Sequence, residues 1–165
     1  MESFNDVYLK YYNMIYRFLL KLSCNSSIAE ELTQEVFYKA FLHIGKFKEK
    51  SSLYTWLCAI AKNEWLRECR RNKHYSFDTV DELTNRTDDI SIVDQLIHRD
   101  IKNKLRKKLL SMPELYRDVL ILHVYADIPL KTIARDKGKS ESWAKVTYYR
   151  AKEYLSREME EFHES

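Results

Sequence analysis

Glycine and proline are almost absent from this chain of 165 residues, which contains only two of each. Both residues mark turns, so their scarcity favours long uninterrupted helices over a sheet with many tight turns. Cysteine is scarce as well. The three thiols, Cys24, Cys58 and Cys69, form no CxxC pair, and unpaired thiols suit a reducing cytoplasm. These shortages predict an all-helical cytoplasmic protein.

Other missing features exclude whole classes of function. No apolar run approaches the ~20 residues that a membrane span needs, and no apolar N-terminal run follows a basic start. GxSxG, P-loop, HExxH and glycine-rich phosphate-binding patterns are all missing, and the five histidines are scattered. We therefore expect no catalysis, no small-molecule substrate, no metal, no cofactor and no direct membrane insertion.

The net charge of +3 is small, but its distribution along the chain is uneven. Residues 62–74 and 101–117 are basic, and the segment between them is acidic. Basic blocks favour a polyanionic partner, because phosphate binding releases condensed counterions. Solvated helix faces give the same pattern, so charge alone leaves both interpretations open.

Three amphipathic stretches with helical spacing occupy the N-terminal part of the chain. Apolar residues recur at intervals of three and four over 4–22, 28–41 and 53–72. Ser27 and Glu30 form a capping-box pattern at the start of the second stretch. Three helices with short joints predict a compact helical domain.

A change in composition divides the chain into two domains. Residues 1–74 hold the three stretches, and residues 75–91, rich in Asp, Thr and Asn, predict a flexible acidic linker. Helical spacing returns over 92–157 with four helices, and the acidic tail 158–165 is expected to fray. The predicted fold is all-α, with a three-helix domain and a four-helix domain joined by the linker.

The last two predicted helices form a helix-turn-helix pattern. PLKTIARDKG is followed by a cap at Ser140 and then by ESWAKVTYYRAKEYL, with Gly138 in the joint. The residues expected to pack the hairpin recur at helical spacing: Trp143, Val146 and Tyr149 or Tyr148. That phase leaves Lys145, Thr147 and Arg150 for a face that could meet DNA. A solvated basic hairpin in an interaction protein has the same features.

Two further surfaces in the first domain suggest partners. The third predicted helix interleaves basic and aromatic residues, and one of its faces carries Asn63, Arg67, Arg70 and Arg71. The connector before it combines aromatic, basic and hydroxyl side chains that can hold an unstacked base: Phe47, Lys48, Ser51, Ser52 and Tyr54. Trp56 and Trp65 continue the apolar stripe and are expected in the core.

The second predicted helix is acidic outside its apolar stripe. The residues on this face are Glu30, Glu31, Gln34 and Glu35. Such a face can dock on a basic helical partner through charge-assisted hydrogen bonds. Plain solvation, with favourable negative charge near the helix start, explains it equally well.

Taken together, three ordered blocks resemble the extracytoplasmic-function sigma factors of bacterial RNA polymerase. The blocks are AEELTQEVFYKAF, then WLCAIAKN followed by RECRR, then MPELYRDVLILHVYADIPLKTIARDKGKSESWAKVTYYRAK. The resemblance covers nearly the whole chain apart from the linker and the tail. It implies that region 2 (1–74) docks on the beta-prime clamp helices, opens the minus-10 element and captures an unstacked base. Region 4 (92–157) would bind the beta flap and read the minus-35 element.

The resemblance also implies roles for individual residues. The clamp-helix contacts would be Glu31, Gln34, Glu35 and Phe37. The base-capturing loop would be Phe47, Lys48, Ser51, Ser52 and Tyr54, beside a minus-10 surface of Asn63, Arg67, Arg70 and Arg71. The minus-35 reading surface would be Ser142, Lys145, Thr147, Tyr148 and Arg150.

The predicted function is therefore that of an alternative sigma factor without catalysis of its own. Its implied partners are core RNA polymerase, promoter DNA and an anti-sigma factor that could hold the chain at the membrane. Two other functions stay open from the residues alone: a stand-alone helix-turn-helix regulator, which would normally dimerise on paired half-sites, and a purely structural interaction module.

Overall fold

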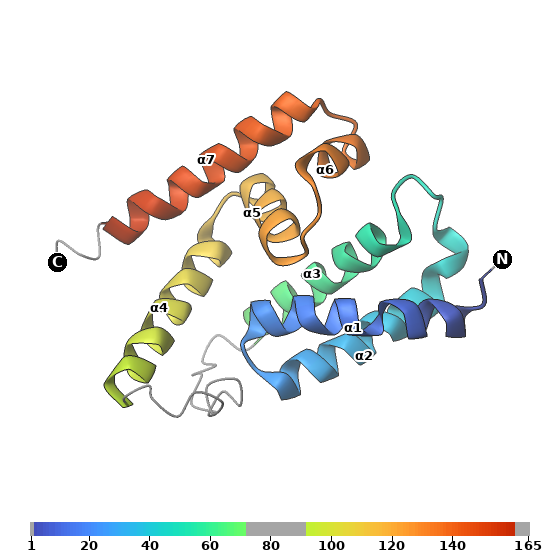
Figure 1. Cartoon of the computed structure of the whole chain (residues 1–165), viewed down its shortest axis with the longest axis horizontal. Coiled ribbons are helices and arrows are strands. Elements are labelled where there is room, and N and C mark those ends of the chain that lie inside the picture. Colours follow the sequence, from blue (N-terminus) through green and yellow to red (C-terminus); the bar gives the residue numbers. More distant parts are fainter. Residues whose placement is uncertain (1, 72–91, 161–165) are drawn as a thin grey trace. The chain divides into compact units, whose positions relative to one another are not determined.

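The computed structural model describes residues 2–71 and 92–160, the side chains of 92–99 and 158–160 excepted. The described residues form helices and turns without a strand, so the predicted all-α class is confirmed (Figure 1). The chain divides into two compact units, Met1–Glu82 and Leu83–Ser165, which we call the first and the second unit. The predicted linker and the end of the acidic tail lie outside the described residues.

The first unit is a three-helix bundle. Its elements are α1 (Phe4–Ser23), α2 (Ser26–His43), the 3₁₀ turn η1 (Ile44–Lys46) and α3 (Leu53–Arg71). Each helix packs on the other two, and the core is filled by Ile15, Phe18, Leu19, Val36 and Leu57. Full burial of such a side chain stabilises the folded state by about 1.5–3 kcal/mol. The bundle is therefore an adequate platform for exposed charged residues.

The helix starts are fixed by side-chain caps, though not all at the predicted residues. The predicted capping box at Ser27 is wrong, because Asn25 caps α2 by accepting a hydrogen bond from the Ile28 N–H at 3.0 Å. Ser52 caps α3 in the same way, with its Oγ accepting from the Thr55 N–H at 3.1 Å. The cap ties the connector 47–52 to the first turn of α3.

The described residues of the second unit form four helices, as predicted. They are α4 (Ile92–Ser111), α5 (Glu114–Leu120) continued by the π-helical turn η3 (Ile121–Tyr125), α6 (Leu130–Asp136) and α7 (Glu141–Glu160). In η3 the Ala126 N–H donates to the Ile121 carbonyl five residues back, at 3.3 Å. Turns of this kind are often found at functional sites. This one turns His123 toward α7, as described below.

α7 packs on α5 and α6 through small side chains. Ala144, Thr147 and Ala151 are buried, whereas Val146 and Tyr149 are exposed. The predicted packing stripe through Val146 and Tyr149 is therefore wrong. Small residues let helix backbones approach closely, so a stripe of alanine and threonine can form the contact while large apolar residues lie outside it. Trp143 and Tyr148, the stripe's alternative to Tyr149, are half-buried.

Cys58 is fully buried in the first unit. Burial raises the pKa of its thiol to about 12, so the reactive thiolate is essentially unpopulated at neutral pH. Among the described residues, none of the three cysteines forms a disulfide, and no helix is both long and apolar enough to span a membrane. Cys58 is thus a packing residue rather than a nucleophile.

Candidate nucleic-acid interface

A charged groove of about 260 Å³ runs between α2 and α3 of the first unit. α2 lines it with the carboxylates of Glu31 and Glu35, and α3 contributes the guanidinium groups of Arg67 and Arg71. The groove therefore brings together two predicted surfaces, the acidic face of α2 and part of the basic face of α3. These surfaces were predicted separately, and helical spacing gave no reason to expect them to meet.

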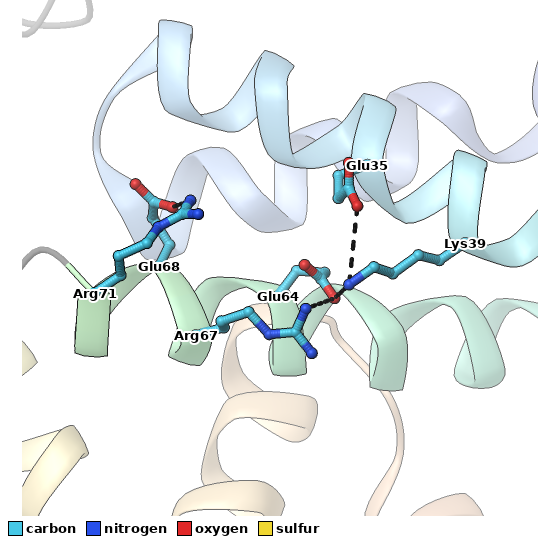
Figure 2. A network of polar contacts seen from close by, with 6 residues as sticks. All are labelled: Glu35, Lys39, Glu64, Arg67, Glu68 and Arg71. Atoms are coloured by element: carbon cyan, nitrogen blue, oxygen red, sulfur yellow. Dashed lines mark hydrogen bonds and ion pairs between the residues drawn. The ribbon is translucent and has the colours of Figure 1, made fainter.

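A network of ion pairs connects the two walls (Figure 2). Lys39 on α2 hydrogen-bonds the Glu64 carboxylate and lies 3.8 Å from Glu35. Arg67 lies 3.7 Å from the same oxygen of Glu64, whose side chain is only 8% exposed. A carboxylate this deeply buried needs cationic partners to offset its lost hydration. Glu64, which the sequence did not single out, is thus the centre of the site.

A second pair sits at the end of the groove. Arg71 donates a hydrogen bond to Glu68 at 2.6 Å. The pKa of Arg71 is raised, mainly by this bond and further by the charges of Glu31 and Glu64. Arg71 therefore interacts electrostatically with Glu31 on the α2 wall and remains exposed to a partner.

Removing the carboxylate of Glu64 should destabilise the first unit more than removing that of Glu68. We expect Glu64→Ala to cost about 1–3 kcal/mol, because Lys39 and Arg67 lose a buried partner. Glu68→Ala breaks a more exposed pair and should cost about 1 kcal/mol or less. Urea unfolding followed by Trp56 and Trp65 fluorescence in a Trp143→Phe background measures both. Equal costs would show that burial of Glu64 does not matter.

The acidic face of α2 is presented as predicted, with one exception. Glu31, Gln34 and Glu35 are exposed. Phe37 is only 3% exposed, and its ring packs edge-on against Tyr8 with centroids 5.1 Å apart. The assignment of Phe37 as a direct partner contact is therefore corrected. Phe37 packs α2 against α1 in the interior of the bundle.

Large apolar side chains that the sequence analysis did not assign to a surface lie on the same exposed face of α2. They are Tyr38, Phe41 and Leu42, each more than half exposed. They follow Glu31, Gln34 and Glu35 at spacings of three, four and seven residues, which places them on one stripe. Helical spacing assigns Phe41 to the buried stripe over 28–41, whereas the structure exposes its side chain.

The connector before α3 is held by its aromatic residues. Phe47 packs on Trp56 with ring centroids 5.2 Å apart, and Tyr54 stacks on Tyr11 of α1. Lys48 is exposed, and the Ser51 Oγ donates to the Ser52 carbonyl at 3.2 Å. Ser52 is occupied as the helix cap. Within the predicted loop, Lys48 thus presents an exposed charge, and Phe47 and Tyr54 present half-buried rings.

The predicted basic face of α3 is exposed throughout its length. It comprises Asn63, Arg67, Arg70 and Arg71. Arg67 and Arg71 turn toward the groove, as their ion pairs with α3 carboxylates show. The four residues can follow a phosphate backbone that passes beside the groove.

The hairpin of α6 and α7 is built as predicted at its joint. Gly138 has φ of +66°, a left-handed conformation that glycine adopts without strain. The Ser140 Oγ accepts a hydrogen bond from the Trp143 N–H at 3.1 Å and starts α7. The second helix of the hairpin is thereby fixed relative to the first.

α7 presents only part of the predicted reading surface. Ser142, Lys145 and Arg150 are exposed, and Lys145 lies 3.4 Å from Glu141. Thr147 is only 4% exposed, and its Oγ1 donates to the Trp143 carbonyl at 2.7 Å. Thr147 is therefore corrected from a DNA-facing residue to a packing residue.

Tyr148 is half-buried and held from two sides. The His123 ring meets it edge-on with centroids 4.8 Å apart, and Lys152 Nζ lies 4.7 Å above its ring. His123 is itself fixed by a 2.8 Å hydrogen bond between Nδ1 and the Ile128 carbonyl. The π-helical turn thus sets the position of Tyr148. Val146 and Tyr149, expected inside, are the exposed apolar residues on α7 that the sequence analysis missed.

A helical bundle with a charged groove, combined with a unit that ends in a helix-turn-helix, defines a DNA-binding factor of transcription. The family description "Sigma-70 region 2" matches residues 7–75, and "Sigma-70, region 4" matches residues 102–155. The chain belongs to the sigma-70 family, in its extracytoplasmic-function group. It is an alternative sigma factor of transcription initiation and not an enzyme.

Individual relatives are similar to this chain in sequence over nearly their full length. The chain is 31% identical to RNA polymerase sigma factor YlaC of Bacillus subtilis, over 96% of this chain and 92% of YlaC. It is 27% identical to the ECF sigma factor SigM of the same organism, over 93% of each chain. Its fold resembles RpoE of Bartonella quintana in complex with the anti-sigma factor NepR, with a TM-score of 0.55, 20% identity and coverage of 97% and 98%. CnrH in complex with the cytosolic domain of CnrY gives a TM-score of 0.58 at 15% identity, with coverage of 95% and 87%.

Proposed function

We propose that the first unit binds core RNA polymerase through the exposed face of α2 and the promoter minus-10 element through α3 and its preceding connector. The polymerase contacts are Glu31, Gln34 and Glu35, which would meet a basic helical surface such as the beta-prime clamp helices. The groove supports this assignment, since the charged side chains that α2 contributes are carboxylates, whereas α3 contributes the guanidinium groups of Arg67 and Arg71 beside Glu64 and Glu68. A cationic protein and an anionic DNA strand can therefore bind side by side.

The basic residues of α3 serve to hold the DNA backbone. Asn63, Arg67, Arg70 and Arg71 bind phosphates, and the pairs of Arg67 and Arg71 with Glu64 and Glu68 orient them beforehand. Phosphate contacts position the duplex without reading sequence. Phe47, Lys48 and Tyr54 read the sequence of the minus-10 element by receiving one unstacked base.

The second unit reads the minus-35 element with α7 and also meets the beta flap. Ser142, Lys145 and Arg150 are the exposed polar groups that can reach base edges and phosphates in the major groove. Tyr148 stands beside them, fixed by His123. The packing of α7 through Ala144 and Ala151 keeps this face outward.

Weak binding by each unit is part of this function. Opening the duplex costs a few kcal/mol for each unstacked step, and non-specific phosphate contacts cannot supply this selectively. Polymerase tethers both units and raises their effective concentration on one promoter. The free chain should thus bind promoter duplex weakly, and the polymerase complex should bind it tightly.

An anti-sigma factor is the second partner that we propose. One solved relative in fold is RpoE in complex with the anti-sigma factor NepR, and another is CnrH in complex with the cytosolic domain of CnrY. An anti-sigma factor that covers the α2 face would compete directly with polymerase. The chain would then act in the cytoplasm and be held at the membrane when its anti-sigma factor is membrane-bound.

Run-off transcription on a fragmented genome of the source organism tests the proposal. Core polymerase with this chain should produce new transcript starts whose upstream DNA shares two spaced elements. The free chain should be monomeric and should select no promoter duplex. A dimeric free chain that binds paired half-sites without polymerase would favour a stand-alone regulator. Failure to bind core polymerase at low salt would contradict the proposal.

A further inference from the structure

One aromatic pair in the first unit joins Tyr54, a residue of the proposed base-receiving loop, to Tyr11, which has no role in the interfaces described so far. Tyr11 of α1 and Tyr54 of α3 stack with their rings inclined by only 19° and their centroids 6.3 Å apart. This is the range of offset stacking, about 4.5–7 Å. Both side chains are half-buried, so the pair is neither core nor fully solvated. Two nearly parallel rings that remain partly accessible can accept a third aromatic ring.

A second stacked pair in the same unit shows what distinguishes this one. Tyr12, the next residue of α1, stacks on Phe37 at 28° with centroids 6.0 Å apart. Phe37 is buried, so that pair is closed to a ligand. In the Tyr11 pair, both rings are half-buried and neither belongs to the core. The Tyr11–Tyr54 pair is thus partly open.

Positive charge lies at one ring of the pair and in the segment that precedes the other in sequence. Lys10 Nζ lies over the Tyr11 ring, 5.3 Å from its centroid, and forms an exposed ion pair with Glu2 at 3.6 Å. Before Tyr54 in sequence, η1 ends in the exposed Lys46, and the connector carries the exposed Lys48 and Lys50 on either side of Glu49. Aromatic rings between cationic groups are the usual surface for single-stranded nucleic acid, because bases stack on the rings while phosphates meet the charges.

We propose that Tyr11 and Lys10 of α1 extend the single-strand site, so that a base of the melted promoter strand stacks on the Tyr11–Tyr54 pair and Lys10 binds an adjacent phosphate. Glu2 is displaced from Lys10 when the phosphate binds. The inference rests on the proposed function, in which Tyr54 belongs to the loop that receives an unstacked base. It adds α1 as a third element that contacts the open strand.

The test uses core polymerase carrying the full chain and a forked DNA with a short random single-stranded segment. Oligonucleotides enriched by the wild-type complex serve as the probe, and their affinity is measured by fluorescence anisotropy. Tyr11→Leu, which keeps apolar bulk but removes the ring, should weaken binding at least about fivefold, as expected for one lost base stack. Tyr11→Phe should bind as wild type. Lys10→Gln should lower the slope of log affinity against log salt by roughly 0.7.

Tyr12→Leu is the matched control, since it removes the neighbouring stack on the closed side and should leave affinity unchanged. Cross-linking from 5-bromouracil in the probe should label Tyr11 in the wild-type complex. Equal affinity of Tyr11→Leu and wild type would overturn the inference, and so would equal losses in Tyr11→Leu and Tyr12→Leu. If the wild-type chain binds polymerase but the complex enriches no probe, the proposed function fails as well. This outcome is distinct from a loss of the Tyr11 effect alone.

Discussion

Reversing the charges of Lys145 and Arg150 together is expected to reduce run-off transcription from promoters with a minus-35 element by at least about a hundredfold. Each side chain is exposed on α7, the second helix of the hairpin. A good contact to a base edge is worth about 1–3 kcal/mol, and a reversed charge adds repulsion from phosphates. The double variant Lys145→Glu, Arg150→Glu therefore loses attraction and gains repulsion at the same place.

Arg157→Glu provides the control on the same helix. Arg157 is exposed and lies 2.8 Å from Glu153 near the C-terminal end of α7. Its reversal changes the net charge in the same direction but two turns beyond Arg150. Transcription should stay within about twofold of wild type, since the residue lies about 10 Å further along the helix than Arg150, roughly one Debye length at physiological salt. A double variant that transcribes as well as Arg157→Glu would show that α7 does not read promoters.

The order of the helices was predictable from the sequence, because apolar spacing and turn residues agreed at most boundaries. Gly138 and Ser140 marked the hairpin joint correctly, and the structure gives both a physical role. The start of α2 was misplaced, because Asn25 and Ser27 are both good caps and spacing alone does not choose between them. The π-helical turn after Leu120 was not predictable, because its apolar pattern is that of an ordinary helix.

The phase of α7 shows why side-chain burial was harder to predict than helix position. Hydrophobic periodicity gives weight to large side chains, so it predicts Val146 and either Tyr149 or Tyr148 inside. The structure buries Ala144, Thr147 and Ala151 instead, and Tyr149 is 67% exposed. Thr147 could be buried because its hydroxyl has a partner within its own helix, the Trp143 carbonyl. This hydrogen bond offsets the cost of burying the hydroxyl. It depends on the backbone geometry of the helix and cannot be read from the sequence.

The charged groove was predictable residue by residue but not as one site. Glu31, Glu35, Arg67 and Arg71 were each named from helical faces. What joins them is Glu64, whose partner Lys39 lies 25 residues away in the sequence. Glu64 was regarded as part of a basic segment, because sequence position does not reveal that a carboxylate is buried against another helix. Long-range ion pairs of this kind require the packed structure.

Charge reversal at Glu31 and Glu35 is expected to weaken binding of the chain to core polymerase by at least about thirtyfold, since removing one partner of a desolvated charge pair costs about 2–5 kcal/mol. Both carboxylates lie on the exposed wall of the groove. Lysine at these positions would repel a basic helical partner. Titration of labelled chain with core polymerase, at low and at moderate salt, measures the change.

The folding cost of the same substitution can be separated from its effect on binding. Glu35→Lys breaks an i,i+4 pair with Lys39, whose side chain is 24% exposed, and Glu153→Lys breaks an i,i+4 pair with the more exposed Arg157 on α7. Helix pairs of this type contribute about 0.3–0.5 kcal/mol, so both variants should stay folded. Only the change at Glu31 and Glu35 should impair polymerase binding, because Glu31 and Glu35 line the groove and Glu153 does not. Equal polymerase affinity of the α2 double variant and the α7 control would exclude the acidic face of α2 from the polymerase interface. A loss of affinity in the α2 variant alone, which becomes smaller as the salt concentration is raised, would identify this face as an electrostatic contact.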